Sequence, residues 1–133
     1  MKVKTAILKY NLFIVAFLCI VFNVNSKTID FSKAAVVISP NADSPLRETA
    51  VRVLCEETQQ RTAIQLPVKS DWGGKTPVIA LALASDTELY GVKIPAAAGK
   101  KELKAEGFRI QAEETGGKNI LWLIGNDNRG ILY

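Results

Sequence analysis

The sequence predicts an α/β domain in which helices sandwich a mixed β-sheet. Short apolar runs rich in β-branched residues recur along the chain, bounded by the Gly, Pro, Asn, Asp and Ser residues that commonly flank strands. One longer segment, residues 45–62, instead has its apolar residues at the spacing of a helix. A strand, this helix, four more strands and the start of a second helix follow one another, which is the order of a sheet covered by helices. The chain has 133 residues, enough for one such domain.

The first strand is predicted over Ala34–Ile38, an apolar run that is closed by Ser39–Pro40. The first helix then begins after Ser44, whose residue type is favourable at an N-cap. Pro45 suits the first helical position, because a backbone N–H there has no partner within the helix. We expect this helix to end near Arg61–Thr62.

Helical spacing divides this segment into two faces. The apolar residues that recur at intervals of three and four predict the buried face: Leu46, Ala50, Val53 and Leu54. The polar residues between them predict a solvated face: Arg47, Glu48, Arg52, Glu56 and Gln59. Cys55 lies beside the apolar face, where we interpret it as a small core residue rather than a nucleophile.

The middle of the chain contains two predicted strands. Ile64–Val68 is expected at the edge of the sheet, because Pro67 cannot donate a hydrogen bond to a neighbouring strand. Asp71–Gly74 is a turn. Pro77–Ala84 is apolar on both faces, which predicts a central strand covered on two sides.

The next segments contain fewer apolar residues. We expect Ser85 and Asp86 to cap one turn of helix that ends near Tyr90, and residues 91–105 to form a loop with a short helical piece. Phe108–Ala112 alternates strictly, as a half-exposed strand does.

A hairpin and the start of a helix complete the chain. Thr115–Lys118 contains two glycines and predicts a hairpin turn, with Asn119–Ile124 as the partner strand. In the following Gly125–Tyr133, Asn and Asp precede an apolar Ile-Leu-Tyr run, which is the pattern of a helix start. Asp127 and Arg129 are interpreted as a cap and as a charge that ties this turn to its own sheet. The alternative is that they contact a substrate or a neighbouring domain.

The first 26 residues have the pattern of a signal peptide. A basic start, residues 1–10, is followed by the apolar run Leu12–Phe22 and by the small residue Ser26 at a position that signal peptidase reads. This run is too short to span a bilayer comfortably. We therefore expect cleavage after Ser26, no membrane association of residues 27–133, and export to the periplasm or the medium. The alternative is a retained N-terminal anchor.

The composition excludes several classes of function. Three of the 17 lysines and arginines (Lys2, Lys4 and Lys9) lie in the leader, which leaves 14 basic against 13 acidic residues. This near balance argues against a nucleic-acid partner. Histidine is absent from the sequence, which excludes Ser-His-Asp and Cys-His catalysis and histidine-bound zinc. Cys55 is the one cysteine after the leader, so residues 27–133 cannot form an internal disulfide.

Four motifs have some features of functional sites, and we interpret all four as structural. The adjacent carboxylates Glu56–Glu57 and Glu113–Glu114 point in different directions on a helix or strand, so neither pair can share a site. Gly73–Thr76 echoes a phosphate loop but precedes a strand instead of a helix. Trp72 and Tyr90 could stack on a sugar, although we favour a packing role. We assign no catalytic, cofactor-binding or metal-ligating residue and expect no cofactor.

The final strands and the C-terminal turn carry a resemblance. The segments Glu106–Ile110 and Ile120–Tyr133 resemble the end of the N-terminal non-catalytic domain of α-glucuronidases, glycoside hydrolase family 67. The helix end Glu56–Thr62 fits the same domain. The accessory domain of bacterial β-N-acetylhexosaminidases is related. Ala63 departs from the pattern, because such domains often place a glycine there to end the helix.

The resemblance implies an accessory domain over residues 27–133, with the mixed β-sheet sandwiched by helices that glycosidase accessory domains have. In these families the final turn begins a long helix that packs on the sheet, and a catalytic (β/α)₈ barrel follows. We therefore expect the chain to be a fragment truncated at its last helix and inactive alone, with the barrel of the same parent enzyme as its partner and polysaccharide (xylan) as a possible ligand. The alternatives are a hexosaminidase-type accessory domain, a complete exported carbohydrate-binding or adaptor module, and a remnant with no stable fold.

Overall fold

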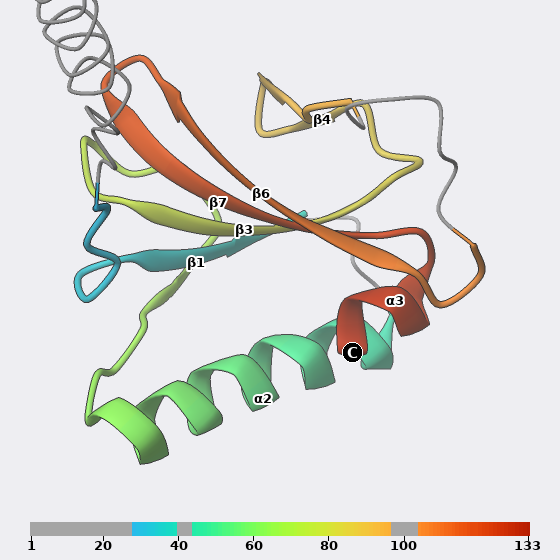
Figure 1. Ribbon diagram of the computed structural model, residues 1–133, viewed down its shortest axis with the longest axis horizontal. Coiled ribbons are helices and arrows are strands. Elements are labelled where there is room, and N and C mark those ends of the chain that lie inside the picture. Colours follow the sequence, from blue (N-terminus) through green and yellow to red (C-terminus); the bar gives the residue numbers. More distant parts are fainter. Residues whose placement is uncertain (1–27, 40–43, 97–103) are drawn as a thin grey trace, which may run out of the picture.

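The computed structural model describes residues 28–39, 44–96 and 104–133 (Figure 1). The predicted signal peptide, Pro40 and residues 97–103 of the predicted loop lie outside these ranges. The elements in chain order are β1 (Ala35–Ile38), α2 (Pro45–Thr62), β2 (Val68–Lys69), β3 (Val78–Leu83), β4 (Glu88–Leu89), β5 (Val92–Lys93), β6 (Phe108–Thr115), β7 (Lys118–Gly125) and α3 (Asn128–Leu132).

Five strands form one mixed sheet in the order β2-β1-β3-β7-β6. The first four are parallel, with Val36 opposite Ile79 and Ala80 opposite Trp122. The edge strand β6 runs antiparallel to β7, with Ile110 opposite Leu123. The predicted class, an α/β domain built on a mixed sheet, is therefore confirmed.

Apolar layers cover both faces of this sheet. Figure 1 shows α2 and α3 on one side and the β4–β5 hairpin on the other. The helix side holds the buried cluster Ala34, Val36, Ala50, Val51, Leu66, Ile79 and Leu81. The opposite side holds Val37, Val78, Ala80, Ala82, Leu89, Ile94, Ile120, Trp122 and Ile124. Within the described ranges the second layer of the sandwich is thus a hairpin with its loops, and not a helix.

Helix α2 begins and ends where the sequence predicts, but its buried face is rotated. Leu46 and Val53 are 37% and 41% exposed, whereas Arg47 is only 7% exposed. The residues that meet the sheet and α3 are Arg47, Ala50, Val51 and Leu54, which also follow a helical period. The assignments of Leu46 and Val53 to the buried face and of Arg47 to the solvated face were therefore wrong.

A left-handed residue ends α2, and a short edge strand follows. Ala63 adopts the left-handed conformation at φ 59° and its N–H donates to the Gln59 carbonyl at 2.9 Å, which ends the helix. The edge strand β2 contains only Val68 and Lys69, and not the predicted Ile64–Val68. The predicted edge position is confirmed.

Residues 85–90 form no helical turn, contrary to the prediction. Asp86 instead accepts a hydrogen bond from Leu83 N–H at 3.0 Å, and β4 pairs with β5 as a small hairpin. Tyr90 and Gly91 at its tip have φ of 47° and 77°, the positive values that a tight hairpin turn of this kind requires. Gly91 is the residue type expected in such a turn, whereas the other residue with a positive φ is a tyrosine, Tyr90.

The hairpin of β6 and β7 is confirmed, and β6 is three residues longer than expected. Gly116 and Gly117 have positive φ at its turn, in agreement with the sequence. In the described part of the chain, no helix has both the length and the apolar character to cross a membrane.

Candidate functional site

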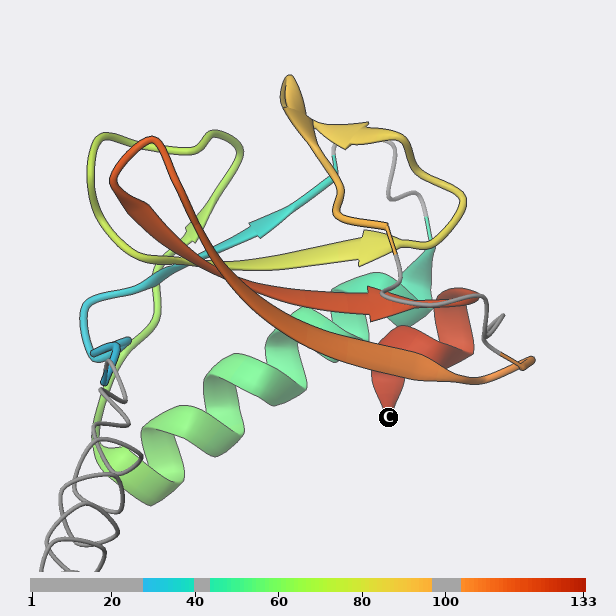
Figure 2. The ribbon, with the colours of Figure 1, turned by 45° about the horizontal axis from the view of Figure 1, so that its top comes forward.

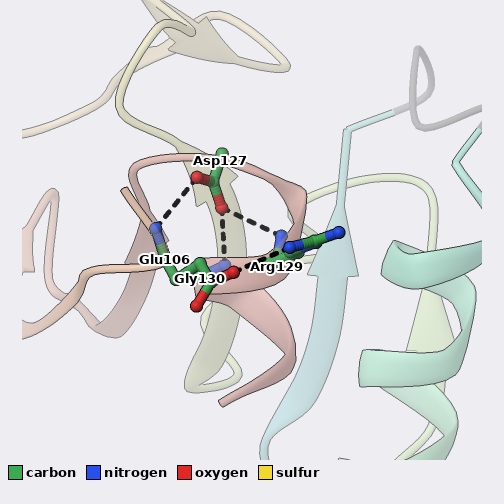
Figure 3. A network of polar contacts seen from close by, with 4 residues as sticks. All are labelled: Glu106, Asp127, Arg129 and Gly130. Carbon is green, nitrogen blue, oxygen red and sulfur yellow. Dashed lines mark hydrogen bonds and ion pairs between the residues drawn. The ribbon is translucent and has the colours of Figure 1, made fainter. Parts of the chain in front are cut away.

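The C-terminal turn, residues 125–130, leads from β7 into α3 and is organised by one carboxylate. Asp127 Oδ1 accepts hydrogen bonds from the N–H groups of Arg129 and Gly130, at 3.0 and 2.8 Å. Its Oδ2 accepts from Glu106 N–H at 2.9 Å (Figure 3). One side chain therefore caps α3 and also ties it to the segment before β6. The predicted cap is confirmed.

Arg129 adds a charge pair to the same turn. Its guanidinium donates to Glu106 Oε1 at 2.8 Å, with side chains that are 68% and 47% exposed (Figure 3). The Glu106 and Gly130 N–H groups hold the pKa of Asp127 below its ordinary value, and Arg129 lowers it further. Glu106 raises the pKa of Arg129. The turn is thus held by charge as well as by backbone hydrogen bonds, as the favoured interpretation predicted.

Two glycines permit the close approach of α3 to the sheet. A Cβ on Gly130 would overlap the Gly107 carbonyl oxygen. A Cβ on Gly125 would lie 2.6 Å from two atoms of Ile131. The Gly107 carbonyl also accepts a hydrogen bond from Asn126 N–H at 2.8 Å. Gly130 therefore lets α3 fit against the loop before β6, and Gly125 lets α3 fold back closely on the end of β7.

A buried arginine joins the two helices. Arg47 Nε donates to Asn128 Oδ1 at 2.8 Å, which links the first turn of α2 to the first residue of α3. Neither residue was predicted to be a partner of the other. Arg47 follows the helical period of the buried residues, but its charge placed it on the solvated face. Its partner is 81 residues away, so no local pattern indicates the pair.

An apolar groove of about 360 Å³ lies beside this turn. Its lining comes from α2, β6, β7, the end of β3 and α3: Ala50, Val53, Leu54, Glu57, Leu81, Phe108, Ile110, Leu123, Ile124, Gly125, Gly130, Ile131, Leu132 and Tyr133. Phe108 and Ile110 are 48% and 60% exposed, and Tyr133 is 76% exposed. Figure 2 shows the end of α3 on the helix side of the sheet, beside β6. Most of the large exposed apolar side chains among the described residues thus border one groove.

Two other carboxylates of the motifs considered above, Glu57 and Glu113, have structural partners. Glu57 forms an exposed ion pair with Arg61 at 2.8 Å. Glu113 Oε1 accepts a hydrogen bond from the buried Trp122 Nε1 at 2.9 Å. Successive residues of a strand point to opposite faces, so Glu114 is directed away from Glu113. These contacts stabilise the fold, and the carboxylate of Glu113 is held against the indole of Trp122 on the neighbouring strand β7.

The two aromatic candidates take part in packing. Trp72 Nε1 donates to the Leu89 carbonyl at 2.7 Å, and its ring meets Trp122 edge-on, with centroids 5.6 Å apart. Lys118 Nζ lies 5.8 Å from the Trp72 ring centroid and donates to the Trp72 carbonyl. Tyr90 OH donates to the Ile38 carbonyl at 3.0 Å. Both aromatic residues are therefore half-buried supports of the sheet.

The remaining candidates also have structural roles. Gly73 lies in a turn that Asp71 closes by accepting its N–H at 2.8 Å, and the chain continues into β3. Cys55 is half-buried, and its Sγ lies 3.7 Å from the Leu66 carbonyl oxygen. Burial, and then the charge of Glu56, raise the pKa of the Cys55 thiol, which disfavours the nucleophilic thiolate. No group of three potential metal ligands occurs among the residues that the structure describes.

Comparison with known proteins identifies one family. The family model described as the N-terminus of glycosyl hydrolase family 67 matches residues 23–133. This range includes every strand and helix described above. A search of curated proteins finds no match.

Proposed function

Because the chain belongs to the family of N-terminal domains of glycosyl hydrolase family 67, we propose that it is the non-catalytic N-terminal domain of an exported α-glucuronidase. Its role is to support a (β/α)₈ catalytic barrel that acts on the glucuronic acid side chains of xylan. The family match supports a glycoside hydrolase as the parent enzyme, and with it a catalytic domain in that parent.

The observation that carries this proposal is the apolar groove beside α3. Ile131 and Leu132 pack against the buried cluster on the helix side, whereas Tyr133 is exposed at the groove. Large apolar surfaces that border a groove are typical of interaction sites. We assign the groove to the catalytic part of the parent enzyme, because Ile131, Leu132 and Tyr133, at the end of α3, line it.

The C-terminal turn would make this junction rigid. Asp127 holds the start of α3 to the segment before β6, and Arg47 holds it to α2. A helix that is fixed at its first turn from two sides has a defined direction. The sheet would then act as a platform that sets how the following domain is oriented.

Export is the second part of the proposal and rests on the leader. Residues 1–26 contain the basic start, the apolar run and the small terminal residue of a signal peptide. Xylan is a polymer that cells meet outside the cytoplasm. A periplasmic or extracellular location therefore agrees with the proposed substrate.

The alternatives have less support. A hexosaminidase-type accessory domain would share the fold, but the family model that matches is that of family 67. A stand-alone carbohydrate-binding module was suggested by two aromatic rings that could stack on a sugar. Trp72 and Tyr90 are instead half-buried and hydrogen-bonded to the fold.

The test begins with the coding DNA beyond the Tyr133 codon. The proposal predicts an open frame that encodes a barrel, and a secreted product that releases glucuronic acid from glucuronoxylan oligosaccharides. Residues 27–133 expressed alone serve as the matched control and should release no sugar. A stop codon after Tyr133, or activity on N-acetylhexosaminides alone, would overturn it.

A further inference from the structure

We draw no further inference here: the strongest candidate outside the site already described, the open hollow between α2 and the edge strand β2 that is lined by Ile38, Val51, Cys55 and Val68, is a largely apolar surface for which nothing in the structure shows what covers it.

Discussion

The guanidinium of Arg47 and the side-chain amide of Asn128 join the first turns of α2 and α3 through a 2.8 Å hydrogen bond. Arg47 is 7% exposed, so its charge is largely removed from water. A buried charged group that loses its partner is strongly destabilising. This contact therefore holds the first turn of α3 against the first turn of α2.

Removing this contact should destabilise the domain. We expect Asn128→Ala to lower the free energy of unfolding by roughly 1–3 kcal/mol, because it leaves the Arg47 guanidinium without its partner. Urea unfolding of residues 27–133, followed by tryptophan fluorescence, measures the effect. Arg52→Ala, an exposed position on the same helix, is the control and should change stability by less than about 0.5 kcal/mol. Equal effects of the two substitutions would refute a role for the pair.

The capping carboxylate of Asp127 should make stability depend on pH. Its pKa is lower in the folded chain than the ordinary 3.8, because N–H groups of Glu106 and Gly130 stabilise the charged form. The unfolded chain therefore binds a proton more readily at acidic pH. The contribution is fully present above the ordinary pKa and is lost as the pH falls through the lower folded value.

Asp127→Asn tests this dependence, because the amide oxygen can still accept the N–H groups of Arg129 and Gly130 at the cap but the group cannot titrate. The amide NH2 cannot accept from Glu106 N–H, so the variant also loses that hydrogen bond at every pH. We expect the variant to lose part of the decline in melting temperature between pH 5 and pH 2, measured by circular dichroism. Asp71→Asn, another carboxylate that accepts a backbone N–H, serves for comparison. A pH profile unchanged from the parent chain would contradict the assigned role of Asp127.

Gly130 should not tolerate a side chain. The added methyl of Gly130→Ala would overlap the Gly107 carbonyl, so α3 must move away from the loop before β6. Overpacking of this kind costs roughly 1–3 kcal/mol, although alanine favours a helix more than glycine does. Thermal unfolding measures the loss, with Lys75→Ala at an exposed turn as the control. A Gly130→Ala variant as stable as the parent chain would show that α3 is not packed this closely.

Ala63 offers a stabilising substitution. It is held at φ 59°, where a Cβ is disfavoured, and glycine fits this conformation without strain. We expect Ala63→Gly to raise the free energy of unfolding by roughly 0.5–1 kcal/mol, since the relief of strain exceeds the entropy cost of glycine in the unfolded chain. Thr62→Gly, one residue earlier and within α2, should lower it instead. Urea unfolding distinguishes the two signs.

Much of the fold could be predicted because its signals are local. The apolar run of β3, the two glycines between β6 and β7, and the cap at Asp127 each determine their own segment. Family resemblance in the C-terminal turn also came from a local motif, and the family model agrees with it.

The incorrect predictions concern segments whose structure depends on contacts with distant parts of the chain. The buried face of α2 depends on how the helix lies on the sheet and on the contact with Asn128. The spacing of residues within the helix therefore could not show that Arg47 is buried and Val53 exposed. The turn after β3 forms a hairpin because Tyr90 accepts a positive φ. The groove is a product of α2, β6 and α3 together, and none of these segments indicates it alone.

The exposed apolar groove should also affect the association state of the isolated domain. Residues 27–133 expose Phe108, Ile110 and Tyr133 together, and we expect them to self-associate as concentration rises. Phe108→Glu should reduce this association, because it places a charge on the apolar surface. Sedimentation velocity measures it, with Gln111→Glu on the opposite face of β6 as the control. Association that Gln111→Glu abolishes and Phe108→Glu leaves intact would locate the surface elsewhere.

The central claim is that the parent enzyme covers the groove. We would measure thiol labelling of Ile110→Cys, in a Cys55→Ala background, in residues 27–133 and in the protein that the full reading frame encodes. Ile110 is 60% exposed in the chain described here, so labelling of the shorter protein should be fast. We predict a rate at least about tenfold slower in the full protein, because a covered side chain reacts only when the structure opens. Equal rates, with Lys75→Cys as the exposed reference, would contradict the account.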